Sequence, residues 1–224
     1  MKLASLTTQF QTYPITAIIE TALCVGAGGS SGSLADKPIV RNAAGTLLIP
    51  GSHLKGRWRH ECEKLARGLG LLVSESPNPG AMMKQPDCLI SPIFGNPVQA
   101  ARLQVDDLIC EFDRSELPTE VIRPGVTINR RRGTAEDEKL YFLETSPPNQ
   151  KLRFTGEIHL EQVAEIDYAL PLLIAGLKHI QALGGSKSAG LGWLTWQLPD
   201  AFTMGADHPG WAALRSKMKS PGES

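Results

Sequence analysis

The clearest structural signal in the chain lies in residues 48–69, which read LIPGSHLKGRWRHECEKLARGL. A β-like start is broken by Pro50 and Gly51, and Ser52 then stands where a helix N-cap is expected, because its hydroxyl can accept a backbone N–H. Helical spacing follows in an apolar stripe, formed by Leu54, Trp58, Cys62, Leu65 and Leu69. The sequence therefore predicts an amphipathic helix from about Ser52 to Gly68.

The start of this helix combines features of an anion site. Gly56 weakens the first turns, which suggests that something approaches the backbone closely there. Free N–H groups, the positive end of the helix dipole and Lys55 would together attract an anion. Two interpretations remain open: a helix start that grips a phosphate backbone, and a basic amphipathic helix on the surface.

Composition limits the class of protein. The 224 residues are 42% hydrophobic and 21% charged, which is typical of a globular chain. The formal net charge of zero excludes a uniformly basic nucleic-acid binder, so any such surface must be a local patch. We expect no signal peptide or membrane segment, because no apolar run is long enough. A reduced, cytoplasmic protein is expected, because no CxxC pair occurs among Cys24, Cys62, Cys88 and Cys110.

The order of predicted elements indicates an α+β fold. Strands are predicted at 14–25, 103–112, 151–160 and 193–198, helices at 52–68 and 166–183, glycine-rich loops at 26–33 and 184–192, an insertion at 74–96, and a long hairpin or irregular arm at 119–146. With the arm set aside, this is a βαββαβ ferredoxin-like pattern. We expect one domain over residues 1–199. In the tail, residues 200–224, we expect a short helix near Trp211–Met218 and a disordered end from Lys219.

Two regions could contact phosphates. The loop at 184–192 is no P-loop, because Lys187 follows serine rather than glycine, yet its backbone N–H groups could still cradle a phosphate. A plain connecting loop is the alternative. The arginines of the arm form a basic patch, with a solvated loop balanced by Glu136, Asp137 and Glu138 as the alternative.

Asp36 is a lone acid in a polar loop, and composition alone favours a surface aspartate. Its carboxylate could instead bind a divalent cation or assist proton transfer in phosphodiester cleavage. No structural zinc is expected, because no standard ligand set is formed by His53, His60, Cys62 and Cys88.

Five stretches occur in a characteristic order: residues 36–41 (DKPIVR), 49–59 (IPGSHLKGRWR), 94–96 (FGN), 123–134 (RPGVTINRRRGT) and 184–192 (GGSKSAGLG). Together they resemble the RAMP superfamily backbone subunits of type III CRISPR effector complexes, over about residues 14–198. The stretch at 125–135 looks closest to the type III-D and III-E branches. The chain departs from these branches before Phe94, where Cys88 stands alone in place of a cysteine-rich zinc site.

The resemblance implies a modified ferredoxin-like (RRM-like) core with an inserted thumb hairpin, in a subunit that stacks with its neighbours along CRISPR RNA. It implies that Asp36 is the catalytic residue and metal ligand, cleaving target RNA with Mg or Mn. The implied thumb wedge is Val126, Ile128, Leu140 and Phe142. The implied RNA-binding residues are Ser52, His53, Lys55, Gly56, Arg57, Arg59, Arg123, Arg130, Arg131, Arg132, Gly185, Lys187 and Ser188.

Three alternatives remain open at this point. The subunit could bind CRISPR RNA without cleaving, could be a metal-independent CRISPR RNA-processing nuclease with a catalytic histidine, or could be a ferredoxin-like module unrelated to RNA.

Overall fold

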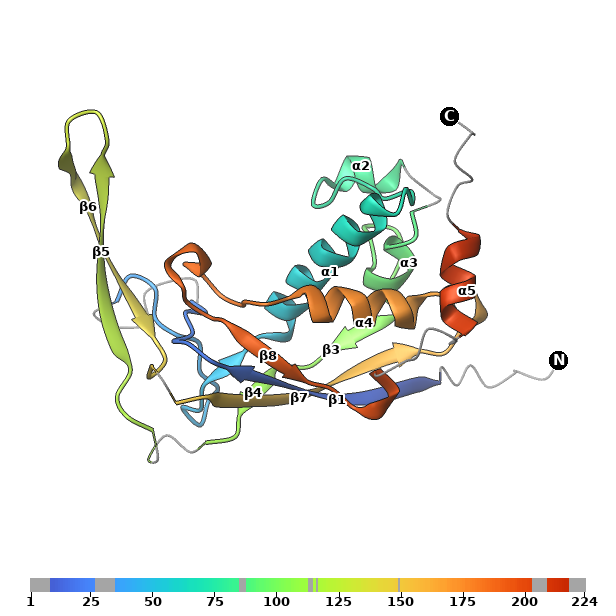
Figure 1. The fold of residues 1–224 in the computed structure, drawn as a ribbon, viewed down its shortest axis with the longest axis horizontal. Coiled ribbons are helices and arrows are strands. Elements are labelled where there is room, and N and C mark those ends of the chain that lie inside the picture. Colours follow the sequence, from blue (N-terminus) through green and yellow to red (C-terminus); the bar gives the residue numbers. More distant parts are fainter. Residues whose placement is uncertain are drawn as a thin grey trace.

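A central antiparallel sheet carries two long helices on one face, and a separate hairpin projects beyond one end of it (Figure 1). The computed structural model describes residues 9–26, 35–84, 88–112, 115, 117–148, 150–202 and 209–217. The predicted glycine- and serine-rich loop falls largely outside these residues, as does the predicted disordered end of the tail.

The sheet is built around two ten-residue strands, β1 (Phe10–Ile19) and β7 (Leu152–Glu161), paired along their whole length. Outside β1 lies β8 (Leu194–Gln197), and outside β7 lie β3 (Leu103–Val105) and β4 (Leu108–Cys110), with β2 (Leu48–Ile49) beyond β4. Among the described strands of this sheet, every pairing is antiparallel. The order agrees with the predicted βαββαβ arrangement.

Two strand predictions need correction. The strand expected at 14–25 begins earlier, at Phe10, and ends at Ile19. The strand expected at 103–112 is split at Asp106 and Asp107 into β3 and β4. The split has a packing reason. Neither Gly51 nor Gly156 could carry a Cβ, because the backbone of this turn lies against both.

The helices α1 (Gly51–Gly68) and α4 (Ala169–His179) pack on each other and on the sheet. Trp58 is fully buried, and its Nε1 donates to the Leu173 carbonyl at 2.8 Å. A Cβ on Gly176 would clash with Cys62 Sγ, so α4 needs glycine there to approach α1. The predicted apolar stripe holds as far as Cys62, after which Ala66 is buried and Leu69 is 42% exposed.

The helix predicted at 166–183 is shorter than expected. A 3-10 turn, Ala164–Ile166, precedes α4, and the backbone is extended at Ile180. The insertion contains α2 (Pro79–Met83) and α3 (Ser91–Phe94). After the 3-10 turn Asp200–Phe202, α5 (Pro209–Ser216) contacts α4, in agreement with the short helix expected near Trp211. Among the described residues, no helix combines the length and the apolarity needed to cross a bilayer.

The segment predicted as a hairpin or an irregular arm forms an antiparallel hairpin of β5 (Val121–Asn129) and β6 (Thr134–Thr145). Its register shifts between Val126 and Ile128. The hairpin belongs to a sheet of its own and stands away from the helices (Figure 1).

Candidate nucleic-acid interface

Residues 22–26 follow β1 and are hydrogen-bonded to the glycine-rich loop and to the base of the hairpin. We call these residues the hub segment. The Ala22 carbonyl accepts from Gly192 N at 2.9 Å, and the Cys24 carbonyl accepts from Gly185 N at 2.7 Å. Leu23 N donates to Ser146 Oγ at 2.9 Å, just after the hairpin. The hub segment therefore ties the glycine-rich loop to the base of the hairpin.

The segment that carries Asp36 also runs along the hub. Val40 N donates to the Val25 carbonyl at 3.0 Å, and Gly26 and Ile39 form an antiparallel bridge. Three of the five stretches that define the family resemblance, residues 36–41, 49–59 and 184–192, thus meet close to the hub segment, since the start of α1 reaches the glycine-rich loop through His53.

Asp36 lies against the hairpin. Its Oδ2 accepts from Phe142 N at 2.7 Å, and Lys37 forms a parallel bridge with Leu143. The Asp36 side chain is exposed and accepts no other hydrogen bond from the described residues. One carboxylate oxygen is therefore held by strand β6, and the group as a whole faces solvent.

The same segment is held to the base of the hairpin, by Glu120 just before β5 and by Glu144 in β6. Arg41 Nη2 lies 2.6 Å from Glu120 Oε1 and 2.9 Å from Glu144 Oε1. Glu144 Oε2 accepts from Ile39 N at 2.9 Å. The guanidinium and the carboxylates are 13–20% exposed, so these contacts are screened less than surface ion pairs.

The start of α1 differs from the prediction. The helix begins at Gly51, Pro50 is the N-cap residue without a side-chain cap, and Ser52 is exposed inside the first turn, so the predicted Ser52 cap is wrong. Asp107 Oδ1 accepts from Gly51 N at 2.8 Å instead. The Asp107 carboxylate thus occupies part of the anion site that was predicted at the start of α1. Gly56 is exposed, and a Cβ there would meet nothing within 4 Å.

The basic residues of α1 already have partners in the chain. Lys55 Nζ donates to the Leu103 carbonyl at 2.7 Å, and burial, with Arg59 nearby, lowers the pKa of Lys55. Arg57 pairs with Glu61 at 2.6 Å, and Arg59 pairs with Glu63 at 2.8 Å and donates to the Gly95 carbonyl. These three cations are therefore less available to a phosphate than the sequence suggested.

Glu61 forms a buried anionic centre beneath this face. Its side chain is 1% exposed and meets Arg57, Lys64 and His179, the last at 2.6 Å. Burial raises the pKa of Glu61, but the hydrogen bonds from Lys64 and His179 and the charge of Arg57 outweigh it, so the pKa lies below its ordinary value. Glu61 therefore remains ionised and neutralises part of the helix face.

The glycine-rich loop begins at a buried glycine and is exposed farther along. Gly184 has a φ of 88°, and a Cβ there would lie 2.5 Å from the Cys24 carbonyl oxygen, so only glycine fits. Gly185 and Ser188 are exposed, while Lys187 is half-buried and its Nζ lies 3.4 Å from the Gly184 carbonyl. The backbone N–H groups of Gly184, Gly185 and Gly192 already donate to other segments, and those of Ala189, Gly190 and Leu191 donate within the loop. Few N–H groups are therefore left for the predicted phosphate cradle, which stays a prediction.

His53 joins the start of α1 to this loop. Its Nε2 accepts from Gly184 N at 3.1 Å, and the side chain is half-buried. Burial lowers the pKa of His53, and the positive charges of Lys187 and Arg57 lower it further. The neutral imidazole is therefore the form that fits this position.

The hairpin carries the most exposed apolar residues of the site. Val126 pairs with Leu140, these side chains are 45% and 59% exposed, and Ile128 is 60% exposed. Phe142 is half-buried near the base. At the tip, the Asn129 side chain accepts from the backbone N–H groups of the turn.

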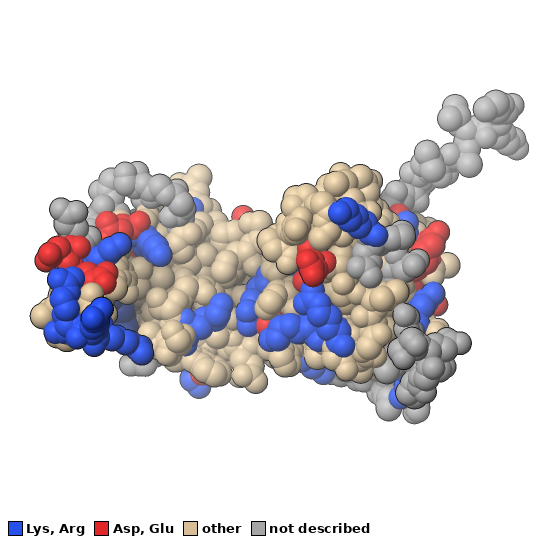
Figure 2. Space-filling model, turned by 90° about the horizontal axis from the view of Figure 1, so that it is seen from above, with Lys and Arg blue, Asp and Glu red and all other residues tan. Residues whose placement is uncertain are grey.

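Four arginines are exposed on the hairpin and make no ion pair with the described residues: Arg123, Arg130, Arg131 and Arg132. Figure 2 shows a group of basic side chains on the hairpin, with acidic ones beside it, and a second group over the helix face. The hairpin group is the more available of the two for phosphate contacts.

Sequence reasoning missed two features away from this site. Asp106, Glu157 and His159 place possible metal-ligand atoms within 4.8 Å of one another, on the sheet face opposite the helices. The strict alternation of residues 151–160 would have placed Glu157 and His159 together.

Of the cysteines considered for zinc, Cys62 and Cys88 are buried, with Sγ contacts to the Leu172 carbonyl and to Ser74. All four thiols are free.

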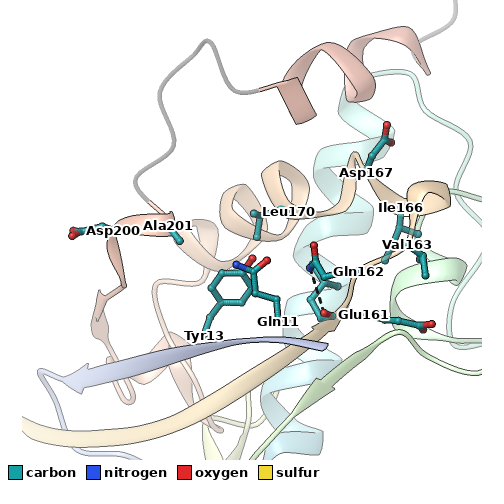
Figure 3. A pocket seen from close by; sticks show the side chains of 11 residues that line it. Gln11, Tyr13, Glu161, Gln162, Val163, Ile166, Asp167, Leu170, Asp200 and Ala201 are labelled. Atoms are coloured by element: carbon teal, nitrogen blue, oxygen red, sulfur yellow. Dashed lines mark hydrogen bonds between the residues drawn. The ribbon is translucent and has the colours of Figure 1, made fainter. Parts of the chain in front are cut away.

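The second feature is a pocket between the start of β1, the end of β7 and α4, shown in Figure 3. It lies at the end of the sheet away from the hairpin (Figure 1). Its lining includes three carboxylates, on Glu161, Asp167 and Asp200. A phosphate would be repelled there, so the pocket does not extend the candidate interface.

The chain matches known proteins. Residues 16–195 match the RAMP superfamily as a family. A curated protein of Methanocaldococcus jannaschii, described as "CRISPR system Cms endoribonuclease Csm3", is 29% identical over 193 residues, which cover 78% of this chain and 74% of that protein. The family match spans the hub segment, the helix α1 and the hairpin.

Proposed function

The chain belongs to the RAMP superfamily, and from this premise we propose that it is a CRISPR RNA-binding backbone subunit of a type III effector complex that also cleaves complementary target RNA. The Methanocaldococcus jannaschii relative is named an endoribonuclease, and this name supports RNA cleavage in general terms. The assignment of the cut to Asp36, its need for a cation and the III-D or III-E branch are our own predictions.

The hydrogen bond between Asp36 and strand β6 carries the proposal. It attaches an exposed carboxylate to the hairpin that presents two exposed apolar side chains, Val126 and Leu140. Because the Asp36 segment, the glycine-rich loop and the hairpin base are joined by the hub, RNA held by one is positioned against the others. An RNA backbone held in this way would be oriented for in-line attack on the scissile phosphate by the hydroxyl beside it.

The residues fit a cation that arrives with RNA. Asp36 is one exposed carboxylate and belongs to no cluster of three possible ligands among the described residues. Mg²⁺ is commonly held by one or two carboxylates, together with phosphate oxygens and water. In that setting Asp36 would hold the ion, which supplies charge stabilisation at the scissile phosphate.

The hairpin would act as a wedge in the guide–target duplex. Its apolar side chains can pack against unstacked bases, and its four exposed arginines can hold the flanking phosphates. Unstacking costs a few kcal/mol per base step, so these contacts must recover that energy. The other members of the complex, neighbouring backbone subunits among them, are the proposed partners.

Co-purification tests the binding part of the proposal. We expect the chain, purified with its complex, to carry RNA of uniform length. The absence of RNA would favour a ferredoxin-like module with no role in RNA binding. Cleavage of precursor RNA by the isolated chain without a metal would favour the processing nuclease. Binding without any cut at this subunit's position would favour a purely structural subunit.

A further inference from the structure

The His53 imidazole connects α1 to the glycine-rich loop by a hydrogen bond with Gly184, which lies 131 residues away in sequence. His53 lies in the first turn of α1, and its Nε2 accepts a hydrogen bond from Gly184 N at 3.1 Å. A backbone N–H can only donate, so Nε2 must be the unprotonated nitrogen of the ring. The contact therefore exists only in one tautomer of neutral histidine.

The loop on the other side depends on this contact. Gly184 is buried with a positive φ, and its neighbour Gly185 donates to the hub at Cys24. If His53 were not an acceptor, the buried Gly184 N–H would be left without a partner, which is unfavourable. The loop would then keep its bond to the hub and lose its bond to α1.

Two positively charged groups near His53 favour the neutral ring. Lys187 of the loop and Arg57 of α1 act on His53 directly. Glu61 lies one turn beyond Arg57 and interacts with Lys187, but it is shared among Arg57, Lys64 and His179 of α4. The surroundings of His53 are thus positive, and protonation of the ring, which would add a further positive charge, is disfavoured.

We propose that His53 is a positioning residue, which holds the glycine-rich loop against α1 as a neutral hydrogen-bond acceptor and does not itself contact phosphate. This inference rests on the proposed RNA-binding function and assigns a different role to His53 from the RNA contact predicted from the sequence. Protonation of His53 would affect a phosphate contact and an acceptor role in opposite directions. Protonation would strengthen a phosphate contact, whereas it would break the bond to Gly184.

The test compares three variants of the full-length chain. In His53→Gln, the side-chain oxygen can replace Nε2 as an acceptor without titrating. In His53→Leu, the volume is similar but there is no acceptor. His60→Gln, at an exposed histidine of the same helix, is the control. Two quantities are measured: hydrogen exchange of the Gly184 amide by NMR without RNA, and affinity for a labelled single-stranded RNA of guide length at pH 8 and at pH 5.

We expect His53→Gln and His60→Gln to keep Gly184 protection and RNA affinity within about twofold at pH 8, while His53→Leu loses protection and about tenfold in affinity. On acidification, Gly184 protection should fall in the natural chain and stay constant in His53→Gln. Unchanged Gly184 exchange in His53→Leu would overturn the inference, as would equal losses of RNA affinity in the Gln and Leu variants. If the natural chain bound no RNA although Gly184 were protected, the proposed function itself would fail, and the RNA-binding role of His53 with it.

Discussion

Substitutions of Asp36 separate the hydrogen bond that its side chain accepts from the catalytic role that we propose for it. The carboxylate accepts from Phe142 N at 2.7 Å, and it is the proposed catalytic group. Asp36→Asn keeps an oxygen that can accept this hydrogen bond but removes the charge. Asp36→Ala removes both. The pair of variants therefore distinguishes anchoring of the hairpin from chemistry at the phosphate.

The expected magnitudes differ enough to decide between the roles. An exposed hydrogen bond of this kind stabilises by about 1 kcal/mol, so its loss changes an equilibrium by about fivefold. Loss of a group that holds the cation or moves a proton should cost about 10²- to 10⁴-fold in rate, or about 3–5 kcal/mol. If Asp36 is catalytic, both variants lose at least about 10²-fold. If it only anchors, Asn behaves like the natural residue and Ala loses about fivefold.

Single-turnover cleavage of end-labelled target RNA by the assembled complex, with Mg²⁺ present, measures this difference at the cut position of this subunit. Target binding, measured separately, should change little in Asp36→Asn. The control is Asp137→Asn, which removes an exposed carboxylate from the same hairpin. Chelation of the divalent ion should reproduce the loss. A normal cleavage rate in Asp36→Ala would refute the catalytic assignment.

Further predictions concern the hairpin and the charged residues. Replacing Val126 and Leu140 by serine should change the free energy of unfolding by less than about 1 kcal/mol, because both are exposed, yet chemical probing should show fewer interruptions in the guide–target duplex; an unaltered pattern would contradict the wedge. Arg131→Gln should lower the slope of log affinity against log salt by about one unit across RNA sequences, and Lys55→Gln by less, because Lys55 donates to a backbone carbonyl; a sequence-selective loss would indicate base readout. Arg41→Met should cost about 2–3 kcal/mol in urea unfolding, since it removes the guanidinium that neutralises two carboxylates at the hairpin base; a cost below about 0.5 kcal/mol would show that solvent replaces the guanidinium.

The parts of the fold with strong periodicity were predictable. Helix α1 and strand β7 lie almost where their patterns placed them, because a stripe through Leu54 and Trp58, and strict alternation in β7, each report one buried face. The break between β3 and β4 was not predictable, because it depends on Gly51 and Gly156 coming into contact with the turn. Pattern alone does not reveal such a tertiary contact.

The sequence predicted which segments form the candidate site, but not the contacts that individual residues make there. The spacing of Arg57 and Arg59 from Glu61 and Glu63 is a four-residue helical pairing visible in the sequence, and it could have shown that these arginines are not free. The contact of His53 with the glycine-rich loop joins residues 131 positions apart, so no local signal announces it.

The apolar contacts beneath the hub have a consequence for local stability. Ala22, Cys24, Leu143 and Leu191 form a small buried cluster that is separate from the main core between sheet and helices. So few side chains bury little area, so the hairpin base and the glycine-rich loop should open together at a lower free energy than β1 and β7. Amides of β6 should then exchange with solvent through a partial opening that leaves the core folded. A ligand that spans both segments would suppress that opening in proportion to its affinity and concentration, so that hydrogen exchange in this four-residue neighbourhood would report occupancy of the interface.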